Sequence, residues 1–188
     1  MSRSRSGPFV HAFGTAFGEV ALVWSEESGS TKVRRVFLSS PGLSAGVAAA
    51  ACRGCPVPGS DPVTTGLAGR ICHTLEGGAA EFNLSIADLS VCSDFQRSVL
   101  LTESRIPRGE VWSYSRLAEE SGHSGMYRAV GRVLSANPFP VIIPCHRTVK
   151  SDGSPGGYQG GTRMKLALLR MEGAVFTSSD RLMLTVSR

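Results

Sequence analysis

The sequence lacks any stretch that is long and apolar enough to span a membrane as a helix of about 20 residues. Its first six residues are basic and serine-rich, but no apolar run follows them, so we expect no signal peptide. No internal repeat is visible. Without an export signal, the five cysteines favour a reducing compartment over a disulfide framework. We therefore expect an intracellular protein, cytoplasmic or nuclear, that does not associate with membranes.

The composition is that of a globular protein, with 41% hydrophobic and 19% charged residues among 188. This length is sufficient for one sizeable domain or two small ones. Lysine and arginine number 20 against 15 acidic residues, which gives a formal net charge of +5. A positive balance favours a polyanionic partner, although alone it is only supporting evidence.

The N-terminal half predicts a small sheet with helices and carries no recognisable catalytic chemistry. Apolar and polar residues alternate, with turn-forming residues between them. The elements expected are a hairpin within 9–38 with its turn at 26–30, a short helix in 41–51, an exposed loop over 53–66, a helix near 67–75 and a strand over 82–86.

Cysteines in this half raise the question of a metal. Cys52 and Cys55 form a C-x-x-C pair, and Cys72 and His73 follow. Such a set could hold zinc. The intervening segment is rich in proline and glycine, however, and we favour a loop that carries two small thiols. We therefore predict no metal site.

Two short helices beyond residue 90 form a predicted helix-turn-helix. A helix capped by Asp94 precedes them, Ser113 caps the first of the pair, and the second runs over 126–136. In this motif the second helix enters a DNA groove, which places Arg128 at the base stack and Arg132 nearer the phosphates. The alternative is that the two helices are only a packing unit.

The most informative stretch is Pro144-Cys145-His146-Arg147. The apolar run Val141-Ile142-Ile143 precedes it and is predicted to form a short buried strand that ends at the proline. A cysteine held just past a strand end, beside an imidazole, can act as a thiolate nucleophile. Taken alone, this tetrapeptide would favour an inert buried cysteine, and only the segments on both sides of it reverse that interpretation.

The segments after Cys145 add a flat pocket and a possible third catalytic group. Residues 151–161 are too rich in glycine for helix or strand and permit close approach of a flat ligand, with Tyr158 as one wall. The alternative is a flexible surface loop. A helix over 163–172 follows, capped by Thr162. Glu172 at its end would either orient the imidazole or be solvated. The residues expected to be buried on this helix are Met164, Ala167, Leu168 and Met171.

The stretch from Phe95 to Gly173 resembles the C-terminal domain of the O6-alkylguanine-DNA alkyltransferases, also called methylated-DNA–protein-cysteine methyltransferases. Order and spacing match over nearly the whole stretch, and Pro-Cys-His-Arg is specific to that family. The N-terminal half matches only weakly. The matching pieces are Ile106-Pro107 with Gly109, Tyr114 with Leu117-Ala118, Arg128-Ala129-Val130-Gly131, Asn137-Pro138, Pro144-Cys145-His146-Arg147, Gly157-Tyr158, Gly160-Gly161, Lys165, Leu168-Leu169 and Glu172-Gly173.

The resemblance implies direct-reversal DNA repair by a single transfer per molecule, with no cofactor. Cys145 would take the alkyl group from O6-alkylguanine, and His146 would deprotonate it through a water. Glu172 would hold His146, and Tyr114 would give a hydrogen bond or a proton to the leaving guanine.

The resemblance also implies the partner and the residues that contact it. The partner would be double-stranded DNA carrying O6-alkylguanine, bound through its minor groove by a monomer. Arg128 would fill the place of the extruded nucleotide, and Asn137 would brace the hinge after the recognition helix. The other DNA-binding residues would be Tyr127, Ser115, Arg132 and Ser151. The pocket residues would be Pro140, Thr148, Tyr158, Gln159 and Lys165.

Three positions depart from the family pattern. Arg108 stands where an aromatic residue is frequent and is expected to add surface charge without altering the chemistry. Tyr127 replaces a usually small residue in the recognition helix and bears on how that helix enters the groove. Thr148 replaces an aliphatic residue and is expected to change the polarity of the pocket.

The fold class expected is α+β, with a small sheet-plus-helix domain packed on a mainly helical domain that holds the helix-turn-helix and an active-site loop. The expected boundaries are a disordered tail over 1–8, domains over 9–90 and 91–175, and an extension over 176–188. Three other functions remain as alternatives: a lesion-binding module without transfer, a cysteine hydrolase with a Cys-His-Glu relay, and a transcription regulator that senses alkylation through Cys145.

Overall fold

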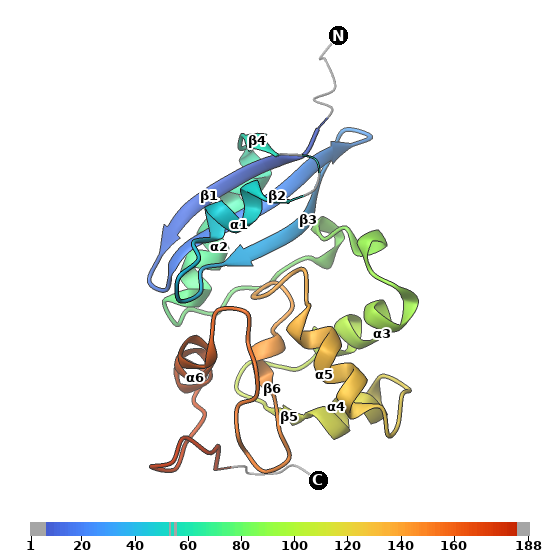
Figure 1. The fold of residues 1–188 in the computed structure, drawn as a ribbon, viewed down its shortest axis with the longest axis vertical. Coiled ribbons are helices and arrows are strands. Elements are labelled where there is room, and N and C mark those ends of the chain that lie inside the picture. The colour runs from blue at the N-terminus through green and yellow to red at the C-terminus, as the bar shows by residue number, and fades with distance from the viewer. Residues whose placement is uncertain (1–6, 53, 55, 184–188) are drawn as a thin grey trace. The chain divides into compact units, whose positions relative to one another are not determined.

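The predicted N-terminal hairpin is present in the computed structural model, which describes residues 7–52, 54 and 56–183 (Figure 1). β2 (Gly18–Glu27) pairs antiparallel with β3 (Ser30–Leu38). Ser28 and Gly29 link them with φ values of 52° and 76°, the left-handed geometry that a tight hairpin turn needs. β1 (Phe9–Thr15) and β4 (Val57–Pro58) complete a sheet of order β3-β2-β1-β4.

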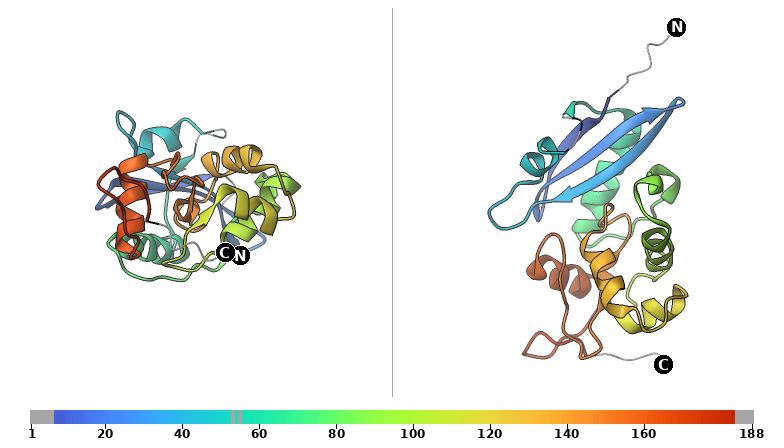
Figure 2. Two further views of the ribbon diagram at one scale, coloured as in Figure 1. Left: turned by 90° about the horizontal axis from the view of Figure 1, so that it is seen from below. Right: turned by 45° about the vertical axis from the view of Figure 1, so that its right-hand side comes forward.

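Both faces of this sheet are covered, because β2 is buried along its middle on both sides. Ala21 and Val23 pack against α1 (Ala45–Ala50). Leu22 and Trp24 alternate with them, point to the other face and are also buried. Figure 2 shows α1 and α2 (Pro62–Leu75) on opposite faces of the sheet.

Two predictions for this half are wrong. α2 begins at Pro62, inside the predicted loop over 53–66, because Asp61 accepts a hydrogen bond from Thr64 N at 2.7 Å and proline suits a first helical turn. The predicted strand over 82–86 is instead the 3₁₀ turn η1 (Leu84–Ile86), in which Asn83 caps Ser85 N at 2.9 Å. A second such turn, η2, spans Leu89–Val91.

The chain divides into two compact units. The first comprises residues up to Val91 together with Pro138–Ile142, and the second comprises Cys92–Asn137 and the residues from Ile143 onward. With the sheet in the first unit and mostly helices in the second, the α+β class predicted from the sequence is confirmed.

Three helices that contact one another begin the second unit: α3 (Asp94–Glu103), α4 (Tyr114–Glu120) and α5 (Tyr127–Ser135). Ser113 caps α4 as predicted, and its Oγ accepts from Arg116 N at 3.1 Å. For α3 the cap is Ser93 rather than Asp94. α4 and α5, joined by a short turn, are the predicted helix-turn-helix pair.

The predicted strand Val141-Ile142-Ile143 does not exist. The segment is buried, but Val141 has φ of 73° and turns the chain. Pro138, Pro140 and Pro144 surround it, and residues without an N–H cannot donate to a strand ladder. The apolar run therefore signalled burial and not extended structure.

After Pro144 the chain forms the 3₁₀ turn η3 (Cys145–Arg147) and then β6 (Thr148–Val149), which pairs in parallel with β5 (Trp112–Ser113). Residues 151–161 form neither helix nor strand, as predicted. The helix α6 (Thr162–Met171) follows, but its N-cap is Gly161 at φ 86° and not Thr162.

The buried face of α6 comprises Met164, Lys165, Leu166, Leu168 and Leu169, and it agrees only in part with the prediction. Met164 and Leu168 are buried as expected, whereas Ala167 is half-buried and Met171 is 42% exposed. Lys165 is fully buried instead, because its ammonium reaches backbone carbonyl groups inside the unit. Among the described residues, no helix has the length and apolar character required to cross a membrane.

Candidate active site

Cys145 opens η3 in the interior of the second unit and is 4% exposed. Its backbone N–H donates to Ile143 O at 2.8 Å. Asn137, which is 2% exposed, donates from Nδ2 to the same carbonyl at 3.2 Å, and its side chain also hydrogen-bonds the Cys145 thiol. Asn137 thus fixes both the backbone before the cysteine and the sulfur itself.

Burial keeps this thiol protonated. Desolvation, with the nearby Glu103 charge, raises the pKa of Cys145 to about 11, against the lowering effects of the Asn137 hydrogen bond and the Lys165 charge. At pH 7 only on the order of one thiol in 10⁴ is then ionised. A reactive thiolate must therefore be generated at the moment of reaction, by a base inside the site.

His146 is next to this thiol in the chain and is 1% exposed. Its Nε2 lies 3.1 Å from Oε1 of Glu172, the C-cap residue of α6. Its Nδ1 is buried and has no hydrogen-bond partner among the described residues. The ring edge faces Tyr158, with 6.2 Å between ring centroids.

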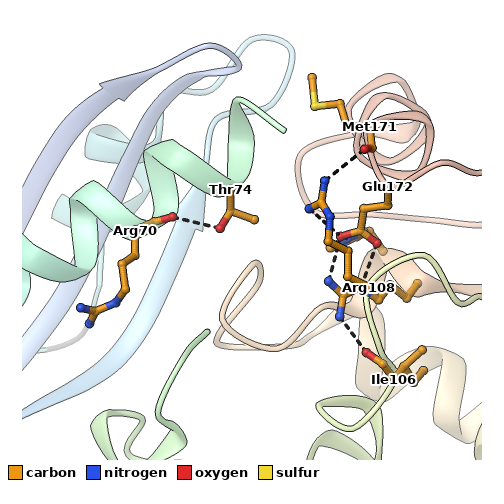
Figure 3. A network of polar contacts seen from close by, with 8 residues as sticks. Arg70, Thr74, Ile106, Arg108, Met171 and Glu172 are labelled. Atoms are coloured by element: carbon orange, nitrogen blue, oxygen red, sulfur yellow. Dashed lines mark hydrogen bonds and ion pairs between the residues drawn. The ribbon is translucent and has the colours of Figure 1, made fainter. Parts of the chain in front are cut away.

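Two arginines also hold the Glu172 carboxylate. Arg147 donates to its two oxygens, from Nε at 2.9 Å and from Nη2 at 2.8 Å, and its Nη1 donates to Ile106 O at 2.7 Å. Arg108 Nη1 lies 3.7 Å from Glu172 Oε1, and Nη2 donates to Met171 O at 3.1 Å (Figure 3). The expectation that Arg108 only adds surface charge is wrong, because it approaches the carboxylate that holds His146.

These contacts determine which nitrogen of His146 carries the proton. Hydrogen bonds from His146 and Arg147, with their charges, overcome burial and depress the pKa of Glu172 to about 2, so the carboxylate is ionised and can only accept. Burial lowers the pKa of His146 even though Glu172 opposes that effect, so the ring is neutral at pH 7. A neutral ring that donates from Nε2 leaves its lone pair on Nδ1, as a general base requires.

Tyr114, Tyr158 and Lys165 lie around the same thiol. Burial and the Cys145 and Glu103 charges raise the pKa of Tyr114 to about 12, which keeps its hydroxyl a donor. A Cβ placed on Gly156 would lie 2.7 Å from Tyr114 Oη, so only glycine lets the loop approach that hydroxyl. Lys165 Nζ lies 5.9 Å from the Tyr114 ring centroid, and Tyr158 Oη is buried with no partner among the described residues.

Sequence reasoning missed a buried carboxyl in this region. Glu103, the last residue of α3, is fully buried, and its Oε2 accepts from Thr148 Oγ1 at 2.6 Å. Thr148, predicted to change the polarity of the pocket, is fully buried as this partner. A glutamate on a helix is normally predicted to be solvated. The unusual Thr148 was therefore the only feature of the sequence that pointed to a polar group buried here.

The start of α5 presents an exposed surface. Met126 and Tyr127 are 46% and 45% exposed, and Arg128 and Arg132 are also exposed. The Arg128 guanidinium lies 5.7 Å from the Tyr127 ring centroid. Large apolar side chains beside exposed basic groups are typical of surfaces that contact nucleic acid.

Other predicted site residues are not part of this cluster. Pro140 is buried in the segment that groups with the first unit. Ser151 is exposed in the loop after β6, and Ser115 and Gln159 are half-buried. Cys55 lies outside the described residues, and within those that are described no three His, Cys, Asp or Glu side chains gather as metal ligands.

Comparisons with known proteins agree on one family. The DNA binding domain of 6-O-methylguanine DNA methyltransferase matches residues 94–174. A methylated-DNA–protein-cysteine methyltransferase of Methanothermobacter thermautotrophicus is 48% identical over 99 residues, covering 53% of this chain and 55% of that protein. One of Shigella flexneri is 43% identical over 95 residues, covering 48% and 56% respectively. The matched stretch thus spans about half the length of these curated relatives.

A solved structure extends the similarity to nearly the whole chain. The crystal structure of Mycobacterium tuberculosis OGT in complex with DNA has a TM-score of 0.70 and 30% sequence identity. The similarity covers 87% of this chain and 92% of that one. The weakly matching N-terminal half is therefore included in a fold that the family shares.

The Glu172 contacts predict an acid-sensitive contribution to stability. The folded pKa of about 2 lies below the ordinary value of about 4.3, so the stabilisation is present above pH 4.3 and lost as pH falls toward 2. Glu172→Gln should lower the free energy of unfolding by about 2–3 kcal/mol at pH 6, a gap that shrinks below pH 4. Urea unfolding followed by circular dichroism from pH 3 to 6 measures this gap.

The exposed Glu119 on α4 supplies the matched control. Glu119→Gln makes the same chemical change without removing a buried ion pair, so its unfolding curve should follow the wild type at each pH. A Glu172→Gln gap that stays constant down to pH 3 would contradict the ionised, arginine-bound carboxylate.

Proposed function

Because the chain belongs to the 6-O-methylguanine DNA methyltransferase family, we propose that it repairs alkylated DNA by direct reversal. In this reaction Cys145 takes the alkyl group from O6 of guanine and keeps it, so each molecule acts once. The single observation that carries the proposal is the buried Cys145 next to a neutral His146, with Nε2 held by Glu172 and Nδ1 unpartnered among the described residues.

The chemical step balances without a cofactor. The Cys145 sulfur forms a bond to the alkyl carbon as the bond from that carbon to guanine O6 breaks. The thiol proton passes to His146 Nδ1, directly or through a water, and the electron pair of the broken bond leaves with guanine. The thioether product does not hydrolyse, which accounts for a single turnover.

Tyr114 supplies the proton or hydrogen bond that the departing guanine needs. An anionic guanine is a poor leaving group unless a donor meets the charge as it develops. The pKa of Tyr114, raised to about 12, keeps this group protonated at any physiological pH. Its approach to Gly156 places the hydroxyl beside the loop proposed to hold the base.

A buried thiol cannot reach a base inside a duplex, so the nucleotide must be extruded from the stack. Extrusion costs a few kcal/mol, which a side chain that fills the gap partly offsets. Arg128, exposed near the start of α5, is our candidate for that side chain. We propose that α5 binds in the minor groove and that Tyr127 and Arg132 contact the DNA beside it.

The wider assignment follows from the same reaction. The partner is double-stranded DNA carrying O6-alkylguanine, and one polypeptide is sufficient because all reacting groups lie in the second unit. Residues 91–175 form the catalytic and DNA-binding part in this proposal. A protein with this substrate works inside the cell, where its DNA is.

Incubation with a duplex that contains one O6-methylguanine should add one methyl group to the protein and no more. Intact-mass spectrometry followed by peptide mapping should place the adduct on Cys145. Cys145→Ser should retain binding to the duplex and form no adduct, because a hydroxyl is a much weaker nucleophile than a thiolate.

Cys72 provides a matched control, because it is a free cysteine in the first unit. Cys72→Ser should acquire the adduct as the wild type does. An unmodified wild-type protein that binds the lesion tightly would show a lesion-binding module, and turnover beyond one equivalent would show a hydrolase.

The Arg128→Ala variant should react far more slowly with the alkylated duplex, by on the order of tenfold or more, because extrusion costs a few kcal/mol. Its reaction with free O6-benzylguanine should change little, because a free base needs no extrusion. Rates of adduct formation on the two substrates give the comparison.

Arg70 is an exposed arginine on α2 and allows a charge-matched control. Arg70→Ala removes the same charge from the first unit and should leave both rates unaltered. Equal losses on duplex and free base in Arg128→Ala would rule out a role for Arg128 in the base stack.

A further inference from the structure

A buried carboxyl whose charge acts on the Cys145 thiol has no role in the proposed reaction. Glu103 is fully buried, and its Oε1 has no hydrogen-bond partner among the described residues. Burial of a carboxyl with an unsatisfied oxygen is costly, and replacement by an apolar residue would remove that cost. A costly group of this kind indicates a function other than packing.

Hydrogen bonds connect Glu103 to the buried Lys165, whose charge acts on the Cys145 thiol. Thr148 on β6 donates from Oγ1 to Glu103 Oε2 at 2.6 Å, and its own backbone O accepts from Lys165 Nζ at 2.6 Å. Lys165 also reaches Gly157 O at 3.4 Å. One threonine thus links a buried carboxyl on α3 to a buried ammonium on α6.

The charges that act on Glu103 come from each neighbouring element. Lys165 on α6 and Arg147 on η3 stabilise its carboxylate, and Thr148 on β6 gives it a hydrogen bond. In turn, the Glu103 charge acts on Cys145 on η3, on Tyr114 on α4 and on Lys165. No other carboxyl within the described residues acts electrostatically on the Cys145 thiol.

We propose that Glu103 is a positioning residue that acts through Thr148 and Lys165. Its charge makes the reactivity of Cys145 depend on pH. This inference rests on the alkyl transfer proposed above. A protonated Glu103 leaves the positive charge of Lys165 unopposed beside the thiol, which favours the thiolate. An ionised Glu103 opposes the positive charge of Lys165 and therefore disfavours the thiolate.

Burial brings this change close to physiological pH. It raises the pKa of Glu103 to about 8 and lowers the pKa of Lys165 to about 8. Below pH 8 the carboxyl is neutral and the ammonium charged, and both states favour the Cys145 thiolate. Above pH 8 the carboxyl is charged and the ammonium neutral, and both states disfavour it. The gain in rate that higher pH normally gives a thiol is therefore reduced in this protein.

The Glu103→Gln variant separates charge from hydrogen bonding, because the amide oxygen still accepts from Thr148 Oγ1. Adduct formation with free O6-benzylguanine should be measured by intact mass from pH 6 to 9.5. Wild type and Glu103→Gln should react at similar rates at pH 6.5. At pH 9 the variant should be faster by roughly three- to tenfold, as a pKa difference of about half to one unit requires.

Asp94 on the same helix is the matched control, since its side chain is 99% exposed. Asp94→Asn removes an equal charge from α3 and should follow the wild-type pH profile. Should Glu103→Gln fail to fold by circular dichroism, Thr148→Val gives a second test. It removes the hydrogen bond that stabilises the ionised carboxyl, so its rate should also exceed the wild type at pH 9.

The outcomes distinguish this inference from the proposed function. A wild-type protein that forms no adduct at any pH would contradict the alkyl transfer itself. A wild-type protein that reacts, with a ratio of Glu103→Gln to wild-type rate that is constant from pH 6.5 to 9, would overturn the role of Glu103 alone.

Discussion

The geometry of the site depends on the contacts of the Glu172 carboxylate. It ends α6, where the helix dipole disfavours a negative charge, and it is 4% exposed. Two donors compensate, the two-pronged contact of Arg147 and the Nε2 of His146, and Arg108 adds an ion pair at 3.7 Å. Because Arg147 also binds Ile106 O, one carboxylate connects α6, η3 and the turn after α3. The orientation of His146, and hence the position of its basic nitrogen, follows from this connection.

Burial is the second constraint, and it acts against reactivity at rest. Burial raises the pKa of the Cys145 thiol to about 11, so nearly all molecules carry the protonated thiol at rest. The protonated form is protected from nonspecific oxidation and alkylation. In the single-turnover reaction that we propose, such protection preserves the thiol until it meets its substrate. Two polar side chains counteract this effect of burial on the thiol. Asn137 binds the sulfur, and Lys165 brings a positive charge that partly offsets the desolvation.

The sequence could predict the residues of the site better than the structure around them. The Pro-Cys-His-Arg motif singled out Cys145 and His146, which are covalent neighbours. The role of Glu172 came only from the family resemblance, because Glu172 meets His146 across two different elements, α6 and η3. The prediction of a strand at Val141-Ile142-Ile143 was wrong. The apolar run indicated only that the segment is buried, and the flanking prolines cannot donate the hydrogen bonds that pair a strand with a neighbour. Glu103 was missed because the groups that act on it come from three other elements, β6, η3 and α6. No local sequence pattern shows that these elements meet. Arg108 was misjudged for the same reason.

The proposed reaction requires that His146 is neutral, carries its proton on Nε2 and offers its lone pair at Nδ1. Nitrogen-15 NMR of the histidine rings, with His146→Asn used to assign the signal, tests this claim directly. At pH 7 we expect a neutral ring with a protonated Nε2 and an unprotonated Nδ1. A charged imidazolium at pH 7, or a proton on Nδ1, would contradict the account, because neither form can accept the Cys145 proton at the nitrogen that faces away from Glu172.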